Sequence, residues 1–196
     1  MNALVLGNGQ SRKGQDLSLL SKTFIIYGCN GIYRDFAPNY LVAMDEKMTM
    51  EILDCQAETR SVFYTQHSNK LEAMALQGRK INFQRPEPTT LDSGTAAVKL
   101  ATGLGHKKIY LLGFDYISHD QTRYNNVYAG TRNYGPRENH TAEVNLKRWQ
   151  GKMNRLMMDH PDVEYIRVNL NDYPTTIRAK NFHNIGEEEW QIVTNS

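Results

Sequence analysis

The sequence predicts an α/β fold: a single Rossmann-like domain over residues 1–196, with a mostly parallel sheet, helices on both faces and a long lid loop. Short apolar runs alternate with helical patterns, as in folds built around a parallel sheet. The runs are continuous rather than alternating, which is typical of strands covered on both faces. Glycine or aspartate ends four of them, at the sheet edge where such folds bind ligands.

Seven apolar runs are expected to form strands, at residues 3–6, 24–27, 40–44, 61–64, 80–83, 108–112 and 163–168. The run at 80–83 is the weakest of these. Helices with clear apolar stripes are expected from Asp92 or Ser93 to Gly105 and over 141–158. Weaker helical patterns cover 13–21, 46–55, 67–77 and 187–190. After Leu170, the apolar residues show no clear helical or strand period, so the sequence gives little indication of structure there.

Composition narrows the class of protein. A chain of 196 residues with 40% hydrophobic and 22% charged residues is an ordinary globular domain. A net charge of +2 without long charge runs does not indicate a nucleic-acid partner, and no apolar stretch is long enough for a membrane span. The first apolar run is too short for a signal peptide, and two cysteines favour a reducing, cytoplasmic location. The oligomeric state stays open, and a homo-oligomer is possible.

A glycine-rich loop follows the first run. Gly7, Asn8, Gly9 and Ser11 stand where backbone N–H groups can approach a phosphate. The loop is not the dinucleotide fingerprint, because Arg12 occupies the place of the third glycine, so NAD and FAD are disfavoured. The alternative is a tight turn between strand and helix without a ligand.

Polar residues also follow other strands. Asn30 offers both a donor and an acceptor for a base or ribose, although an asparagine in a turn with positive φ is the simpler reading. Asp45 and Asp115 are placed to hold a ribose hydroxyl, act as a base or bind Mg²⁺ through water. Asp45 is equally well placed to cap the following helix. No spacing typical of a transition-metal site is present.

The best-formed helix opens with small residues. Ser93, Gly94 and Thr95, with the free N–H groups of the first turn, are suited to bind an anion or a carboxylate. Capping and close packing of small residues explain the same pattern, and the two readings are compatible. No Gly-x-Ser-x-Gly elbow exists, so the sequence does not indicate a serine hydrolase.

Residues from about 117 to 140 form a long connection without a period. The stretch is rich in tyrosine and arginine, which is not a disordered composition, so we interpret it as a lid that orders over a ligand. His140 ends this lid and is a candidate general base, since the pKa of a free histidine lies near neutral pH. A lone histidine is more often an ordinary surface residue.

Several of these motifs together resemble a known family. The loop at 7–11, the pair at 29–30, the helix start at 93–94 and above all residues 104–116 (LGHKKIYLLGFDY) are similar to bacterial sialyltransferases of glycosyltransferase family 42. Related bacterial and phage domains and archaeal-type hydroxymethylpterin diphosphokinases share the first and third blocks. The resemblance covers about residues 1–45 and 90–145.

The resemblance implies roles for particular residues. Asn8 and Asn30 match asparagines that bind the CMP part of the donor, and Ser93 matches a serine that holds the donor's carboxylate or nucleotide. The family's base is a histidine after the lid, which corresponds to His140. Lid tyrosines bind the leaving phosphate in that family, and the candidates in this sequence are Tyr124, Tyr128 and Tyr134.

This sequence also departs from the family. Asp45 stands where the family has asparagine, so the nucleotide contact there differs or a different donor binds. The lid and the stretch between Asp45 and Ser93 are shorter, and the family's basic C-terminal membrane-associating segment is absent.

The leading functional hypothesis is an inverting glycosyltransferase that uses a CMP-activated or other nucleotide sugar, with no metal or other cofactor and an unidentified acceptor. One alternative is a diphosphokinase or related phosphoryl-transfer enzyme that needs Mg²⁺ on Asp45 or Asp115. A second alternative, favoured by the shortened lid, is a nucleotide-binding module without catalytic activity.

Overall fold

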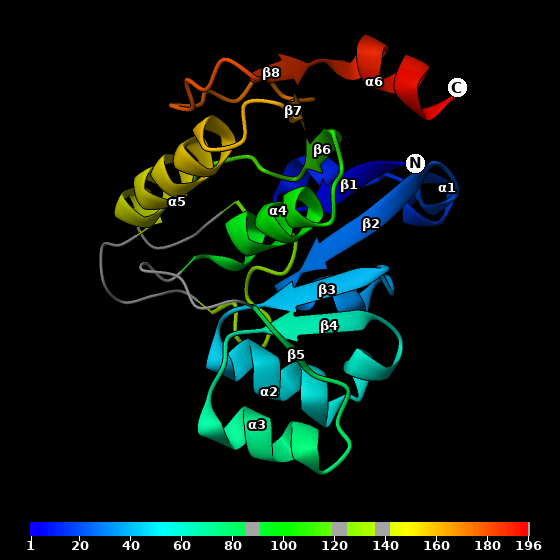
Figure 1. The fold of residues 1–196 in the computed structure, drawn as a ribbon. Coiled ribbons are helices and arrows are strands. Elements are labelled where there is room, and N and C mark those ends of the chain that lie inside the picture. The colour runs from blue at the N-terminus through cyan, green and yellow to red at the C-terminus, as the bar shows by residue number, and fades with distance from the viewer. Residues whose placement is uncertain (85–90, 119–124, 136–141, 196) are drawn as a thin grey trace.

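The computed structural model describes residues 1–84, 91–118, 125–135 and 142–195. Its centre is an eight-stranded sheet in the order β5-β4-β3-β2-β1-β6-β7-β8, and every neighbouring pair is parallel (Figure 1). The strands are β1 (Asn2–Leu6), β2 (Phe24–Cys29), β3 (Tyr40–Ala43), β4 (Val62–Thr65), β5 (Asn82–Phe83), β6 (Lys108–Leu112), β7 (Glu164–Val168) and β8 (Phe182–Ile185). The predicted α/β class with a parallel sheet is confirmed.

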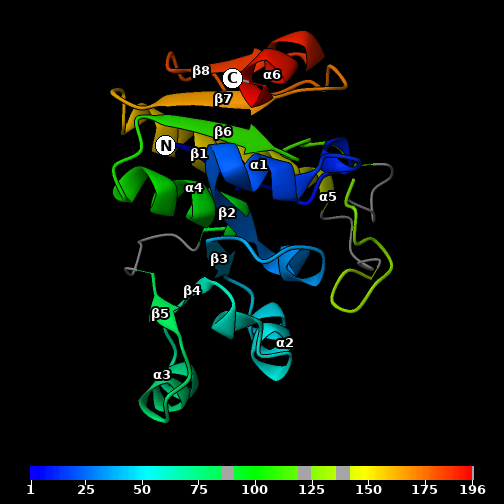
Figure 2. The ribbon, with the colours of Figure 1, turned by 90° about the vertical axis from the view of Figure 1, so that its right-hand side faces the viewer.

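Helices cover both faces of the sheet (Figure 2). The α-helices are α1 (Leu17–Thr23), α2 (Glu46–Asp54), α3 (Asn69–Leu76), α4 (Ser93–Gly103), α5 (Ala142–Met158) and α6 (Glu187–Thr194). Three short 3₁₀ turns are also present: η1 (Gln10–Arg12), η2 (Asn30–Arg34) and η3 (Ala57–Thr59). Helices α1, α2, α3 and α6 supply side chains to the core on one face, and α4 and α5 to the core on the other.

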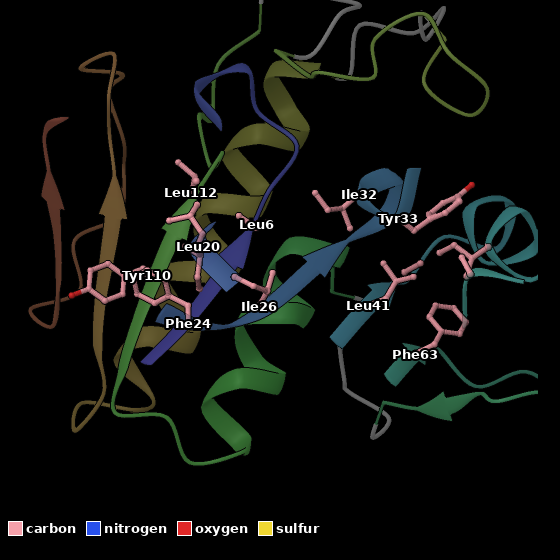
Figure 3. Close-up of a cluster of buried hydrophobic side chains, with 14 of the residues drawn as sticks. Leu6, Leu20, Phe24, Ile26, Ile32, Tyr33, Leu41, Phe63, Tyr110 and Leu112 are labelled. Carbon is pink, nitrogen blue, oxygen red and sulfur yellow. The ribbon is translucent and has the colours of Figure 1, made fainter. Parts of the chain in front are cut away.

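The central strands explain why the sequence forms this sheet. Ala3, Leu4, Val5 and Leu6 of β1 are all completely buried, with alternate side chains entering the two cores. Figure 3 shows one of these cores, where Leu6, Ile26 and Leu112 of neighbouring strands meet the side chains of the covering helices. A continuous apolar run is the pattern that such double coverage requires.

The sequence did not predict β8, which lies at one edge of the sheet. Its central residues, His183 and Asn184, are polar and exposed, so the strand has no apolar run to mark it. The predicted helix after the glycine-rich loop begins later than expected, at Leu17, and the loop itself leads into the 3₁₀ turn η1.

Because all strands are parallel, their carboxyl ends lie at one edge of the sheet. The loops after β1, β2, β3 and β6 gather there, and so do the first turns of α2 and α4 and the second and third turns of α5. This edge is where an open parallel sheet is expected to bind a ligand.

Candidate functional site

A cavity of about 1040 Å³ opens at the carboxyl ends of the strands. Its walls are the loops after β1, β2 and β6, the first turns of α2 and α4, the second and third turns of α5, and part of the segment from 125 to 135. The polar residues in the walls include Asn8, Asn30, Asp45, Glu46, Lys47, Asp92, Ser93, Asp115, Tyr116, Asn125, Asn126, Asn133 and Tyr134. A cavity of this size is large enough for a nucleotide with a further group attached.

The structure brings most of the sequence-predicted site residues to this one cavity. Its lining contains the predicted residues Gly7, Asn8, Gly9, Asn30, Asp45, Ser93, Gly94, Asp115 and Tyr134. Three others do not line it: Ser11, Thr95 and Tyr128. Tyr124 and His140 lie outside the described residues, as does the other lid histidine, His119.

In the glycine-rich loop, the backbone N–H groups of Gly7 and Gly9 form hydrogen bonds within the protein, which was not expected. The N–H of Gly7 donates to the Leu112 carbonyl at 2.8 Å and that of Gly9 to the Gly113 carbonyl at 2.9 Å. A Cβ on Gly7 would lie 2.3 Å from the Gly113 oxygen, so the approach of these two loops requires glycine. The prediction that these N–H groups are free for a phosphate is therefore wrong: they fasten the loop to the end of β6.

Asp115 lines the cavity but its carboxylate is already engaged. One oxygen accepts from the Ser11 N–H at 3.0 Å and from the Asn125 side chain at 2.6 Å, and the other accepts from the Ser11 hydroxyl. The Asp115 side chain is only 4% exposed. Asp115 and Ser11 thus hold the glycine-rich loop and Asn125 together, and three of the roughly four acceptor positions of the carboxylate are used within the protein.

The two predicted asparagines each leave an acceptor without a partner. The Asn8 amide nitrogen donates to the Cys29 carbonyl at 3.1 Å and to the Tyr134 hydroxyl at 3.1 Å. Because a carbonyl can only accept, this bond fixes which end of the Asn8 amide is nitrogen. The remaining oxygen, Asn8 Oδ1, is buried and has no hydrogen-bond partner among the residues that the structure describes, and the same holds for Asn30 Oδ1. Asn30 also has the positive φ, 53°, expected of an asparagine in a turn.

Cys29 lies between these asparagines, and its thiol is not available as a nucleophile. The sulfur donates to the Leu6 carbonyl at 3.3 Å. Burial raises the pKa of the Cys29 thiol to about 12, so the thiol stays protonated at neutral pH.

The start of α4 forms another wall. Asp92 is the N-cap, and its carboxylate accepts from the Thr95 N–H at 2.9 Å and the Thr95 hydroxyl at 2.8 Å. Thr95 therefore completes the cap instead of facing a ligand. Ser93 and Gly94 do line the cavity, and the Ser93 hydroxyl oxygen accepts from the Met44 N–H at 2.9 Å. The N-terminus of this 11-residue helix carries the positive end of the helix dipole, which attracts a negative group.

Of the lid tyrosines within the described residues, Tyr134 is at the cavity and Tyr128 is not. The Tyr134 hydroxyl oxygen accepts from Asn8 at 3.1 Å and from the Gly31 N–H at 3.0 Å. Its own hydrogen has no acceptor among the described residues and can be donated to a ligand. Tyr128 instead bonds Arg12 and Asp35, each at 2.6 Å, so its expected phosphate contact does not fit this structure.

Among the cavity residues that the sequence did not predict, two carry buried polar atoms without a partner in the described part of the chain, Tyr116 and Asn125. Tyr116 has its hydroxyl buried without a partner, and its φ of 54° is uncommon for a bulky residue. Asn125 is 6% exposed; its nitrogen is fixed on Asp115, which leaves its Oδ1 buried without a partner. Tyr116 directly follows Asp115 after β6, a position that the strand-end argument could have included. Asn125 carried no recognisable signal within the lid.

Asp45 lies at the rim of the cavity, at the end of β3. It occupies the N-cap position of α2, but its side chain accepts no capping hydrogen bond. Within the described part of the chain, no group of three or more His, Cys, Asp or Glu side chains could hold a metal ion. None of the helices in that part has the length and apolar character needed to cross a bilayer.

The fold of the chain is similar to that of solved sialyltransferase structures. The structure is similar to the sialyltransferase CST-II in complex with a trisaccharide acceptor and CMP, with 14% identity and a TM-score of 0.51 over 94% of this chain and 89% of that chain. A CST-II variant with CMP gives 14% identity and a TM-score of 0.54 over 94% and 90%. The chain shares its fold with these sialyltransferases. The Campylobacter jejuni enzyme with the substrate analogue CMP-3FNeuAc gives 16% identity and a TM-score of 0.52, with 94% and 90% coverage.

Other comparisons give no match. No protein-family model and no curated protein matches the sequence. The likeness to the sialyltransferases therefore establishes the fold, and the function rests on the chemistry of the cavity.

Proposed function

We propose that the chain binds a nucleotide sugar in this cavity and transfers the sugar to an acceptor hydroxyl, in the manner of a CMP-dependent sialyltransferase. The observation that carries the proposal is a set of buried polar atoms in the cavity residues that have no partner within the described part of the chain: Asn8 Oδ1, Asn30 Oδ1, Asn125 Oδ1 and the Tyr116 hydroxyl. An unsatisfied buried polar group costs about 1–3 kcal/mol, and a ligand that bonds it recovers this energy.

The polar groups of the cavity fall into a set of hydrogen-bond acceptors and a set of donors, and the two sets together suit a nucleotide. The amide oxygens of Asn8, Asn30 and Asn125 are acceptors, which match the amino group of a base or the hydroxyls of a ribose. The start of α4 and the hydroxyls of Ser93, Tyr116 and Tyr134 supply donors, which match a phosphate. The similarity of fold to enzymes solved with CMP supports the same reading.

The proposed reaction is a single displacement. The acceptor oxygen attacks the anomeric carbon, the bond from that carbon to the phosphate oxygen breaks, and His140 takes the acceptor proton as general base. The nucleotide leaves with the electron pair, and the Tyr134 hydroxyl and the start of α4 stabilise its growing negative charge. The role of His140 as the base is taken from the resemblance to glycosyltransferase family 42, and no metal takes part in this scheme.

Calorimetry tests the binding step. CMP, UMP, AMP, GMP and a pterin are titrated into the full chain, each in EDTA and in Mg²⁺. We expect CMP to bind in both buffers. A requirement for Mg²⁺ would favour the phosphoryl-transfer alternative, for which Asp45 and the Asp115 oxygen that accepts a single hydrogen bond are the candidate ligands. If none of the nucleotides binds, the proposal fails.

A matched pair of variants tests the transfer step. His140→Ala should lower the release of CMP from a CMP-sugar by about 10²–10⁴-fold, the range for loss of general-base catalysis, while the affinity for CMP stays unchanged. His183→Ala is the control, because His183 is exposed on β8 and does not line the cavity. Equal activity of the two variants would remove His140 from the mechanism, and binding without turnover in the wild type would indicate a binding module.

A further inference from the structure

Behind one wall of the cavity, β7 carries a buried cation, Arg167. The residue is 1% exposed and pairs in register with Leu111 of β6, the strand that leads into Asp115 and Tyr116 of the wall. The Arg167 guanidinium donates to the Tyr173 carbonyl at 3.0 Å and to the Asp115 carbonyl at 3.1 Å. Among the described residues no carboxylate forms an ion pair with it, and the Asp115 carboxylate attracts it from a greater distance.

A positive charge of this kind is unusual in a protein interior. Buried charges are normally paired, and strongly perturbed ones gather at functional sites. Burial lowers the pKa of Arg167, but a guanidinium stays protonated at neutral pH. The wall formed by Asp115 and Tyr116 is therefore backed by a positive charge that no ion pair within the described part of the chain neutralises.

Two contacts of Arg167 act on Tyr116. The Asp115 carbonyl belongs to the peptide that joins Asp115 to Tyr116, and the Arg167 Cζ lies 5.7 Å from the centre of the Tyr116 ring, within the range of a cation–π contact. Tyr116 has a φ of 54°, a backbone conformation that costs energy in a bulky residue and needs support from its surroundings. Tyr116 lines the cavity whereas Arg167 does not, so Arg167 can act on a ligand through Tyr116.

We propose that Arg167 is a positioning residue, which holds Tyr116 so that its hydroxyl donates to the phosphate of the bound nucleotide and strengthens that bond with its charge. The inference rests on the proposed function, because it requires an anionic ligand in the cavity. The Tyr116 hydroxyl is buried and has no partner among the described residues. Burial raises the pKa of this hydroxyl, so it stays protonated and can donate. In an interior of low dielectric, a nearby cation makes such a bond to an anion stronger.

A double-mutant cycle tests this role. CMP is titrated by calorimetry into the full chain, into Tyr116→Phe, into Arg167→Met and into the double variant. Tyr116→Phe should weaken CMP binding about tenfold or more, the loss expected for one hydrogen bond to a charged group. Arg167→Met should weaken it about fivefold or more when Tyr116 is present and less than about twofold in Tyr116→Phe, because residues that act as a unit are not additive.

Cytidine, which lacks the phosphate, gives a second readout. Both single variants should bind cytidine as the wild type does, so their preference for CMP over cytidine should fall. A loss of packing around β7 would instead weaken both ligands and leave that preference unchanged. Arg155→Met is the control for charge, because Arg155 is exposed on α5 and does not line the cavity; it should change neither affinity.

Unfolding curves in urea establish which variants are folded. If Arg167→Met does not fold, Arg167→Lys takes its place in the cycle. Lysine keeps the charge but lacks the planar fork that reaches two carbonyl groups and covers a ring, so CMP binding should weaken about twofold or more, again only when Tyr116 is present.

Two results would overturn the proposal while leaving nucleotide binding intact. One is that the substitution of Arg167 weakens CMP binding equally with and without the Tyr116 hydroxyl, or does not weaken it. The other is that Tyr116→Phe binds CMP as the wild type does. Failure of the wild type to bind CMP is a separate result, which would overturn the proposed function and this inference together.

Discussion

Asn8 connects three parts of the candidate site. Its amide nitrogen reaches the Cys29 carbonyl at the end of β2 and the hydroxyl of Tyr134 in the lid region. Its backbone carbonyl accepts from the Val127 N–H at 2.8 Å. These bonds fix the amide so that one oxygen is left for a ligand donor.

Replacement of Asn8 by alanine should therefore affect both stability and binding. The Tyr134 hydroxyl would lose one of its two donors, and we expect the free energy of unfolding to fall by about 1–2 kcal/mol. CMP affinity should fall by about tenfold, since one acceptor bond is lost. Urea denaturation and calorimetry measure the two effects. Asn69→Ala, at an exposed position that starts α3, should change neither; an Asn8→Ala variant that binds CMP normally would contradict the nucleotide assignment.

At the scale of elements, the segment from 125 to 135 is attached to the body of the protein through Arg34. The Arg34 guanidinium donates to the Thr131 hydroxyl at 2.6 Å and to the Arg132 carbonyl at 2.8 Å. It also lies over the rings of Tyr128 and Tyr134, 5.5 Å from each centroid. Part of the predicted lid is thus a docked segment, in which one cation contacts two neighbouring aromatic rings.

Glu51 of α2 holds this arrangement from the other side. Its carboxylate accepts from the Arg34 Nε at 2.9 Å, from Asn133 at 2.6 Å and from the Tyr33 hydroxyl. Burial by itself would raise the pKa of Glu51, but the bonds from Tyr33 and Arg34 outweigh burial and lower it. A carboxyl group with a lowered pKa stabilises the folded state above its ordinary pKa and loses that contribution as the pH falls.

Glu51→Gln should therefore lower the free energy of unfolding by about 3 kcal/mol at neutral pH, because it leaves Arg34 without its buried counter-charge. As the pH falls below about 4.3, the ordinary value for glutamate, the wild type should lose stability and approach the variant. Denaturation curves over a series of pH values give the comparison. Glu72→Gln is the control, since Glu72 is exposed and forms an exposed pair with His67. A constant difference between wild type and Glu51→Gln at every pH would contradict the role of its charge.

The elements themselves were largely predictable, and the reason is burial. The run at residues 108–112 matches β6, and those at 3–6 and 24–27 lie within β1 and β2, because these central strands are buried on both faces and must be apolar. The edge strand β8 has no such requirement and was missed. Residues at strand ends were also predictable in position, since the parallel topology brings Asn8, Asn30 and Asp115 together.

What those residues bond was not predictable. The N–H groups of Gly7 and Gly9 bond β6, and the Asp115 carboxylate bonds Ser11, because these partners approach from segments about 100 residues away along the chain. The bond from Arg12 to the Tyr128 hydroxyl was not predictable for the same reason, since these two residues also lie far apart along the chain. The pattern of apolar runs in the sequence locates the strand ends. The tertiary contacts determine which polar groups there remain without a partner and can bind a ligand.

At the scale of the whole molecule, the sheet consists of two parts, of five and three strands, that meet where β1 pairs with β6. Strands β1 to β5 come from the first part of the chain and β6 to β8 from the later part, and β1 pairs with β6 at the junction. The carboxyl end of that junction is the contact between Gly7 and Gly113. Gly7 and Gly113 also line the cavity, so this contact contributes both to the packing of the sheet and to the shape of the site.

Gly7→Ala should therefore destabilise the whole molecule. The added Cβ would lie 2.3 Å from the Gly113 oxygen, and this backbone atom cannot move without separating the two parts of the sheet. Overpacking of this kind costs about 1–3 kcal/mol, which denaturation should detect together with weaker CMP binding. Gly151→Ala is the matched control: Gly151 lies in α5 with no atom near its Cβ position, so alanine should stabilise the helix by about 0.5–1 kcal/mol. If Gly7→Ala proves as stable as Gly151→Ala, the junction is not packed as tightly as its geometry requires, and the link between the central strands and the site is lost.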